Sequence, residues 1–275
     1  MQITFHTDCR VGGMTCVIKL KRIEKPEELT EERQTELTEE FRKNREKDVW
    51  NQPYIRRKLL IESNNKCAYC ECFIGTGYKE MNIDHFHYKN KYVDEVVRWE
   101  NLYPSCPHCN KSKSTHDTCE SPIIDPFEQN PQDFFYVKNY RYYPKNNRVK
   151  FIVRNTIDVL GLNDTKDVVR SRYELGEAII NEIQSIYQLA IENRNLLHKD
   201  IRKRNRVLRG CRNILGKAVR TAEYSAFMAT ILQTEEYYQE LRSLLKEIGL
   251  WDAELQSLDD DMNSKKLSIV PEEKG

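Results

Sequence analysis

Residues 103–113 read YPSCPHCNKSK, and residues 82–87, shortly before them, read NIDHFH. The first stretch contains two cysteines separated by two residues, and a second pair with the same spacing precedes both stretches. Two residues between cysteines let both sulfurs face one ion from a tight turn, and two such turns complete a tetrahedron. We therefore predict a structural zinc site with the ligands Cys67, Cys70, Cys106 and Cys109.

The other cysteines lack this pairing. Cys72 follows the first pair closely enough to be an alternative ligand, although its spacing from Cys70 is poorer. The remaining four are interpreted as ordinary residues; they are Cys9, Cys16, Cys119 and Cys211.

Composition narrows the class of protein. The 275 residues suffice for one large or two ordinary domains, and 39% of them are hydrophobic and 32% charged. No apolar run approaches the ~20 residues that span a bilayer, and the first residues lack the apolar core of a signal peptide. We therefore expect a cytoplasmic protein, in which thiols stay reduced. With a net charge of +1, the protein as a whole does not attract the negatively charged backbone of nucleic acid. Any such attraction depends on local patches of positive charge.

An Asp-His pair lies between the two cysteine pairs. Residues 81–86 have the pattern of a short strand, in which Asp84 and His85 would point to opposite sides. A helix that begins at the second cysteine pair would place Asn110 and Lys113 on one face. Each residue alone has an ordinary interpretation, such as a core histidine or a capping asparagine. Together, a carboxylate, a histidine and an amide between two cysteine pairs suit the hydrolysis of a phosphodiester.

This ordered combination resembles an HNH endonuclease of the ββα-metal type, in its four-cysteine zinc variant. The motif reads Cys67-x₂-Cys70…Asp84-His85…Asn101-Leu102…Cys106-x₂-Cys109-Asn110-x₂-Lys113. Four further stretches resemble the PtuB nucleases of Septu-type antiphage systems, some of them associated with retrons. They begin at Trp50 (WNQPYIRR), Trp99 (WENL), Pro122 (PIIDP) and Thr156 (TIDVLGLN).

The resemblance implies a role for each polar residue of the motif. His85 would be the general base that takes a proton from water. Asp84 and Asn110 would hold one Mg²⁺ or Mn²⁺ through oxygen atoms, the ligands that hard cations prefer. Asn101 would orient the loop of His85 by hydrogen bonding, and Lys113 would contact a phosphate.

One position departs from the family's pattern. Many HNH sites have a proline where this chain has Tyr88, so the loop after the base differs. His87 and His108 are further candidates for the site, although histidines in such loops are often solvated polar residues.

Partners also follow from the resemblance. It implies a PtuA-like ABC-type ATPase that restrains the nuclease until phage infection. Because some PtuB nucleases are associated with retrons, a retron reverse transcriptase with its msDNA is a further candidate partner. The chain has no Gly-x₄-Gly-Lys-Ser/Thr loop, so ATP dependence would come from another subunit. DNA is the favoured substrate. The alternatives are a stand-alone restriction-type HNH nuclease and a catalytically idle zinc module that binds nucleic acid or protein.

The expected fold class is α+β and predominantly helical, with a ββα-metal core, a β-hairpin and a C-terminal helical region. Within residues 134–153 we predict two strands joined by a turn at 144–147. A single helix is expected over about 221–248. The predicted divisions are an N-terminal extension and helix (1–49), the HNH domain (50–125), the hairpin region (126–163), the helical region (164–251) and a disordered tail (252–275).

Two basic segments are candidate binding surfaces. In the first, cationic side chains would neutralise phosphates, and the tyrosines between them would stack on unpaired bases. The five cations are Lys138, Arg141, Lys145, Arg148 and Lys150. The second, residues 199–220, contains nine Lys or Arg, and a solvated or protein-contacting face is an equally good interpretation. We expect the ATPase contact to lie mainly in residues 165–275, with most aromatic residues of that region in the core.

Overall fold

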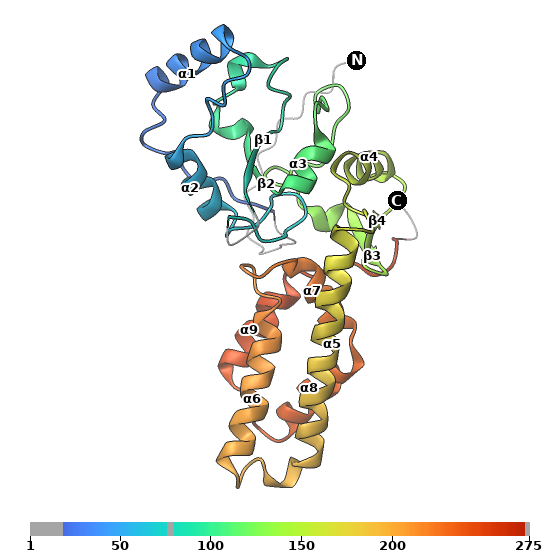
Figure 1. Cartoon of the computed structure of the whole chain (residues 1–275). Coiled ribbons are helices and arrows are strands. Elements are labelled where there is room, and N and C mark those ends of the chain that lie inside the picture. The colour runs from blue at the N-terminus through green and yellow to red at the C-terminus, as the bar shows by residue number, and fades with distance from the viewer. Residues whose placement is uncertain (1–18, 76–79, 273–275) are drawn as a thin grey trace, which may run out of the picture.

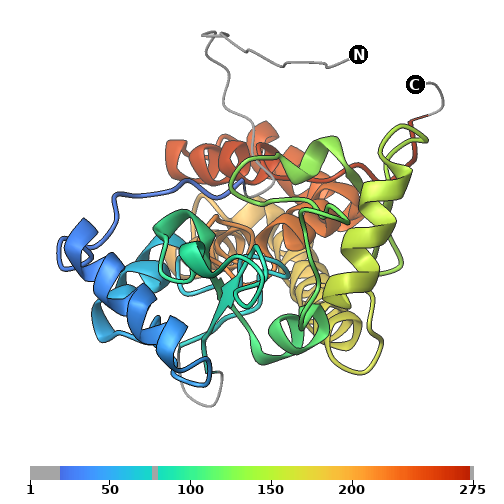
Figure 2. The ribbon, with the colours of Figure 1, turned by 90° about the horizontal axis from the view of Figure 1, so that it is seen from above.

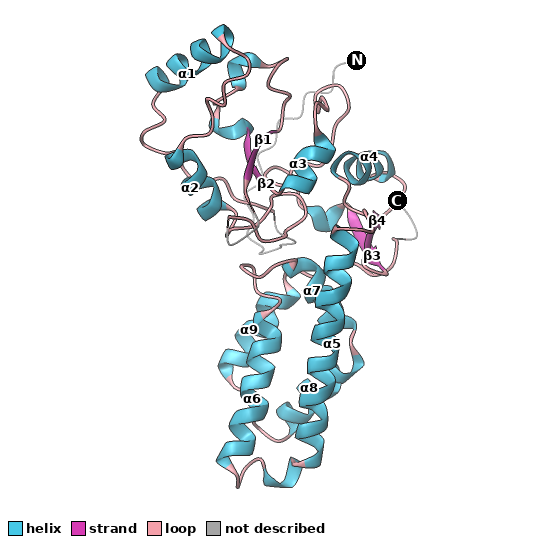
Figure 3. Cartoon of the chain, viewed as in Figure 1, coloured by secondary structure: helices cyan, strands magenta, loops and turns pink. Residues whose placement is uncertain are grey.

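The computed structural model describes residues 19–75 and 80–272. The first 18 residues of the expected N-terminal extension lie outside them. Two regions are evident along the molecule: α1–α4 and both small sheets lie together at one end, and an elongated helical body extends from them (Figure 1). Among the described residues, helices dominate and the strands form two short pairs (Figure 3). The predicted α+β, mostly helical class is confirmed. In the described part of the chain, no helix is both long and apolar enough to cross a membrane.

Two helices precede the small sheet. α1 (Glu31–Lys43) begins after Thr30, whose hydroxyl accepts a hydrogen bond from the amide of Arg33, and glutamates occupy its first turn. α2 (Pro53–Glu62) has proline in its first turn, where no backbone donor is required. Both helices bury apolar residues in the common core; these include Leu37, Phe41, Ile55 and Leu59.

The ββα unit predicted from the motif is present. β1 (Asn82–His85) pairs antiparallel with β2 (Leu102–Ser105), so that Asp84 lies opposite Tyr103. Two 3₁₀ turns, η1 (Val93–Glu95) and η2 (Trp99–Asn101), lie in the connection. α3 (Pro107–Lys113) follows β2 directly and contacts β1. Viewed from above, α1 and α4 (Lys150–Leu160) lie on opposite sides of this unit (Figure 2).

The second hairpin is shorter than the sequence suggested. β3 (Phe135–Lys138) pairs with β4 (Arg141–Pro144) after the 3₁₀ turn η3 (Pro131–Asp133). The turn is formed by Asn139 and Tyr140, both with positive φ, and not by residues 144–147. The predicted second strand, which would follow residue 147, was therefore wrong, and both observed strands end by Pro144, where the predicted turn would begin. The side chain of Asn146 accepts hydrogen bonds from the amides of residues 148 and 149, and helix α4 begins there.

The helical body consists of α5–α9. α5 packs against α6 and α8, and α6 packs against α9. The helix expected over 221–248 is two helices, because Glu235 is extended (φ −81°, ψ 120°) and separates α7 from α8. The bounds are α5 (Val168–Glu192), η4 (Arg194–Leu196), α6 (Ile201–Gly216), α7 (Ser225–Thr234), α8 (Glu236–Glu247) and α9 (Ala253–Asn263).

The prediction of a disordered tail was wrong for residues 253–272. α9 begins after Asp252, whose carboxylate accepts from the amide of Leu255, and Leu255 and Met262 are fully buried. The chain then returns to the hairpin, where the amide of Val137 donates to the carbonyl of Ser268 at 2.8 Å. The prediction failed because the acidic residues of this segment lower its average hydropathy. Its few apolar residues nevertheless share one face of the helix.

Candidate active site and zinc centre

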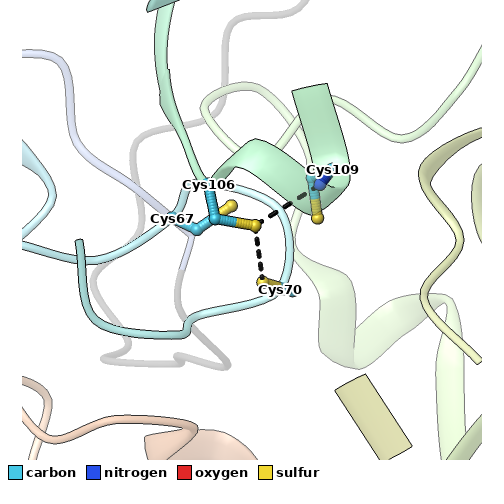
Figure 4. Close-up of side chains that lie close together, drawn as sticks. All are labelled: Cys67, Cys70, Cys106 and Cys109. Atoms are coloured by element: carbon cyan, nitrogen blue, oxygen red, sulfur yellow. Dashed lines mark hydrogen bonds between the residues drawn. The ribbon is translucent and has the colours of Figure 1, made fainter. Parts of the chain in front are cut away.

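The four predicted thiols lie together (Figure 4). Their sulfur atoms all lie within 4.8 Å of one another, and all four residues are buried. The sulfurs of Cys70 and Cys106 are 3.7 Å apart. A tetrahedron of Zn–S bonds of about 2.3 Å has an edge of roughly 3.8 Å, so this donor set fits zinc. Hydrogen bonding between Cys106 and Cys109 lowers the pKa of the Cys106 thiol to about 5 and raises the pKa of the Cys109 thiol.

The first cysteine pair lies in a turn that we call the zinc knuckle, residues 66–73. The amide of Cys67 donates to the carbonyl of Cys72, and the amide of Ala68 donates to the carbonyl of Pro104 in β2, both at 2.8 Å. Cys72 itself is outside the group of four sulfurs. Of the other cysteines in the described ranges, Cys119 is exposed and Cys211 is buried; Cys9 and Cys16 precede residue 19.

The zinc knuckle also contacts the helical body. The ammonium of Lys66 is buried and donates to the hydroxyl of Ser225 at 3.1 Å and to the carbonyl of Arg220 at 2.7 Å. The amide of Tyr224 donates to the carbonyl of Glu71. The zinc centre therefore joins the ββα unit to the loop that precedes α7.

A cleft of about 630 Å³ lies over the ββα unit, and polar side chains line most of it. His85, Asp84 and Asn110 all line it, although alternation along β1 predicted that the first two would point to opposite sides. The remaining lining residues are Asp48, Trp50, Asn51, Arg56, Asn82, Ile83, Tyr88, Lys89, Asn90, Lys111, Ser114 and Thr115.

His85 is held in one tautomer. Its Nε2 lies 2.8 Å from the carbonyl oxygen of Val96. A carbonyl only accepts hydrogen bonds, so Nε2 carries the proton and Nδ1 is the basic nitrogen. Burial lowers the pKa of His85 to about 3, and the nearby cations Lys89 and Lys113 act in the same direction. The imidazole is therefore neutral at physiological pH, and the Trp50 ring packs against it edge to face at 4.6 Å.

The buried carboxylate of Asp84 accepts hydrogen bonds from two side chains. The hydroxyl of Tyr69 donates to its Oδ2 at 2.5 Å, and the ammonium of Lys113 lies 3.1 Å from the same oxygen. Burial raises the pKa of Asp84, and Lys113 and Tyr69 oppose that shift. Lys113 also donates to the carbonyl of His85 at 2.5 Å and is 2% exposed. Lys113 thus contacts the Asp-His pair from inside the protein, where a substrate phosphate does not reach.

Two asparagines differ in their surroundings. Asn110 lines the cleft and is half-buried, and its side chain has no hydrogen bond within the described ranges. Asn101 is buried, and its Oδ1 accepts from the amide of His87 at 2.7 Å. Its Nδ2 donates to the carbonyls of His87 and Glu95. Asn101 therefore braces both ends of the loop that leads from His85 to Val96.

The two other candidate histidines do not line the cleft. The Nδ1 of His87 lies 2.6 Å from the carboxylate of Glu95. The Nε2 of His108 donates to the carbonyl of Gly161 at 3.1 Å, at the C-terminal end of α4. Gly161 has a φ of +61°, and a Cβ there would meet the His108 ring at 2.8 Å. Both histidines have structural contacts.

The five predicted nucleic-acid-binding cations are not in the cleft. They lie on β3, on β4 and around the start of α4, and Lys145 forms an ion pair with Glu272 at 2.7 Å. The cations that do line the cleft are Arg56, Lys89 and Lys111, which are not part of the HNH motif. The sequence did carry a signal for Arg56, since it lies in the stretch that begins at Trp50 and resembles PtuB nucleases.

The comparisons agree with this geometry. Residues 67–116 match the HNH endonuclease family, a span that contains all four clustered thiols, the Asp-His pair and α3. Over 243 residues the chain is 37% identical to the Septu protein PtuB of Bacillus thuringiensis. The aligned region covers 88% of this chain and 92% of that protein. HNH nucleases are metal-dependent hydrolases of phosphodiester bonds. With a four-thiol cluster that fits zinc and near-complete coverage of its relative, the chain belongs to the PtuB family of HNH endonucleases.

Proposed function

We propose that His85 is the general base of this nuclease and that Asp84 and Asn110 hold its catalytic cation. The observation that carries the proposal is the hydrogen bond from His85 to Val96, in a cleft that Asp84 and Asn110 also line. That bond leaves Nδ1 unprotonated, so His85 accepts a proton from a water molecule that attacks phosphorus. Asn101 acts indirectly, by fixing the loop that supplies the Val96 carbonyl.

Asp84 and Asn110 offer one carboxylate and one amide, the oxygen donors that Mg²⁺ and Mn²⁺ prefer. When bound, such a cation neutralises the charge that develops on the phosphate and on the leaving oxygen. The tyrosine and lysine that contact Asp84 keep its carboxylate in place at the edge of the cleft. Tyr88, which stands where many relatives have proline, lines the same cleft and adds an aromatic wall near the substrate.

DNA is the substrate that we propose. Arg56, Lys89 and Lys111 would contact phosphates beside the scissile bond, because all three line the cleft. Arg56 is held by the side chain of Asn51 and by the carbonyl of Met81, and Lys89 lies 3.8 Å from the centre of the Trp50 ring. The basic segment 138–150 would serve as a second, weaker contact for a longer substrate.

We further propose that the nuclease works with a PtuA-like ABC-type ATPase in phage defence, as the Septu name of its relative implies. That name gives no support to a retron reverse transcriptase or its msDNA, and neither is proposed as a partner. The ATPase would dock on the free end of the helical body, where α5 turns into α6. Three apolar residues are exposed there, namely Ile191, Leu196 and Ile201.

Unpaired arginines lie next to that apolar end. A groove of about 560 Å³ between α5 and α6 is lined by Arg202, Arg206 and Arg209, which form no ion pair within the described ranges. By contrast, Arg170, Arg194 and Arg212 of the same body are each paired with a carboxylate. Arginine beside apolar surface is typical of protein interfaces, and an acidic surface of the ATPase is the occupant that fits.

Substrate and partner are tested in two experiments. The purified chain, with and without the ATPase, is incubated with plasmid, single-stranded DNA and tRNA in Mg²⁺, with His85→Ala as the inactive control. Cleavage of DNA by the chain alone that the ATPase suppresses would support the proposal, because the resemblance implies that the ATPase restrains the nuclease. Cleavage by the chain alone, at the same rate, would indicate a stand-alone nuclease, and cleavage of tRNA alone would overturn DNA as substrate.

The docking surface is tested by charge reversal. Arg206→Glu with Arg209→Glu should abolish co-purification of the ATPase, while Arg170→Glu on the neighbouring helix should leave it intact. Retention of the ATPase by the double variant would exclude this end of the body. Truncation at residue 163 is a poorer test, since it removes Ser225 and Arg220, two of the three groups that contact the buried ammonium of Lys66, and keeps only Glu71.

A further inference from the structure

Tyr69 occupies an unusual place between the two metal sites. It lies inside the zinc knuckle, between the ligands Cys67 and Cys70, and its hydroxyl donates to Oδ2 of Asp84 at 2.5 Å. The side chain therefore reaches from the thiol cluster to the carboxylate assigned to the catalytic cation. Among the residues that the structure describes, the other donor on this carboxylate is Lys113 of α3.

The position of Tyr69 is fixed on both sides. Its ring is parallel to that of Tyr103 (6° between planes, 6.0 Å between centres), and Tyr103 in turn stacks on Phe86 at 4.9 Å. The preceding residue, Ala68, is tied to β2 through the carbonyl of Pro104. A bound zinc ion would hold the knuckle at the two cysteines that flank the tyrosine. The hydroxyl thus cannot leave Asp84 without disturbing the aromatic stack or the knuckle.

The contact leaves Asp84 able to hold a cation. An ionised carboxylate has about four lone-pair positions, and Tyr69 and Lys113 use only some of them. A donor fixed on Oδ2 sets the rotation of the carboxylate, and hence the direction of its remaining lone pairs. Hydrogen bonds of this kind, one step behind a metal ligand, usually determine how well the ligand is oriented.

We propose that Tyr69 is a positioning residue for the catalytic metal site, through which the structural zinc knuckle orients the Asp84 carboxylate. The inference rests on the proposed role of Asp84 and adds a specific function to the zinc centre beyond holding the fold together. It assigns this role to Tyr69 and none to Tyr103, whose hydroxyl donates to Asp125 at 2.8 Å and does not reach Asp84.

Tyr69→Phe tests the inference, with Tyr103→Phe as the matched control. Each substitution removes one tyrosine-to-carboxylate hydrogen bond from the same aromatic stack and keeps the ring. The full-length, zinc-loaded chain is titrated with Mn²⁺ by calorimetry, and zinc content and the unfolding midpoint are measured alongside. We expect Mn²⁺ affinity to fall by about 10- to 100-fold in Tyr69→Phe, the usual effect of losing such a partner. Zinc content should stay unchanged, and Tyr103→Phe should bind Mn²⁺ as the wild type does.

Several outcomes would overturn the proposal. Wild-type or tighter Mn²⁺ binding by Tyr69→Phe would do so, as would an equal loss in Tyr103→Phe. Asp84→Ala separates this failure from that of the proposed function: if Asp84→Ala also binds Mn²⁺ normally, then Asp84 is not the ligand.

A second measurement needs no loss of the hydroxyl. 3-Fluorotyrosine introduced at position 69 of the full chain should show a ¹⁹F resonance that shifts when Mg²⁺ is added. The shift should disappear in Asp84→Ala, because only a cation on that carboxylate changes the field at the ring. An unmoved resonance in a chain that binds Mg²⁺ would contradict the proposal, whether or not Tyr69→Phe folds.

Discussion

The ammonium of Lys113 lies 3.1 Å from Oδ2 of Asp84, and both side chains are almost completely buried. The pair connects the end of α3 to β1, directly beneath the cleft. A lysine so placed neutralises the carboxylate and cannot also serve as an exposed contact for a phosphate. The neighbouring Lys111, which is exposed and lines the cleft, is better placed for that role.

Removing the charge of Lys113 should therefore destabilise the protein. Lys113→Met keeps most of the side-chain volume but leaves a buried carboxylate unpaired, and such losses typically cost about 3–5 kcal/mol. Lys111→Met should change the free energy of unfolding by less than about 0.5 kcal/mol, as exposed substitutions usually do. Chemical denaturation of the zinc-loaded protein measures both. Equal losses in the two variants would contradict the assignment of Lys113 to the interior.

His85→Ala should abolish cleavage while substrate binding persists. Loss of a general base lowers the rate by about 10²–10⁴-fold. His198→Ala, on the helical body, is the control and should cleave normally, since its Nε2 donates to the carbonyl of Ile248 and the residue does not line the cleft. Single-turnover cleavage and a binding titration separate the two effects. If His85→Ala cleaves at the wild-type rate, His85 is not the general base.

The zinc site should be structural. Cys67→Ser or Cys109→Ser should give an insoluble or unfolded nuclease region, because the binding energy of such an ion is folding energy. Cys119→Ser is the matched control, since that thiol is exposed and outside the cluster. Solubility, circular dichroism and elemental analysis give the comparison. Active protein that contains no zinc would refute this prediction.

The C-terminal segment should contribute to stability. Met262 is fully buried on α9, and Met262→Ala should cost about 2–5 kcal/mol of unfolding free energy. Ile269, beyond the helix, is 49% exposed, so Ile269→Ala should have little effect. A thermal or denaturant midpoint distinguishes the two. An unchanged midpoint in Met262→Ala would restore the interpretation of this segment as a disordered tail.

Local chemistry explains why much of the site could be predicted from the sequence. A metal that needs four thiols requires cysteines at spacings that a tight turn can close, and Cys67, Cys70, Cys106 and Cys109 have those spacings. An antiparallel pair followed directly by a helix keeps Asp84, His85 and Asn110 close together in space. The starts of α1 and α2 likewise depend on a few adjacent residues, namely Thr30 before α1 and Pro53 in the first turn of α2.

The tertiary structure decided what depends on distant partners. Segments far away in the chain determine whether Lys113 faces a phosphate or Asp84 and whether Tyr69 reaches Asp84. They also determine whether the C-terminal segment folds onto Thr230 and Val137. Burial also decided the state of His85, because its lowered pKa and its tautomer come from the Val96 loop and not from the Asp-His motif. A sequence motif specifies which groups are present, whereas desolvation and hydrogen-bond partners, which control their chemistry, arise only when the chain packs.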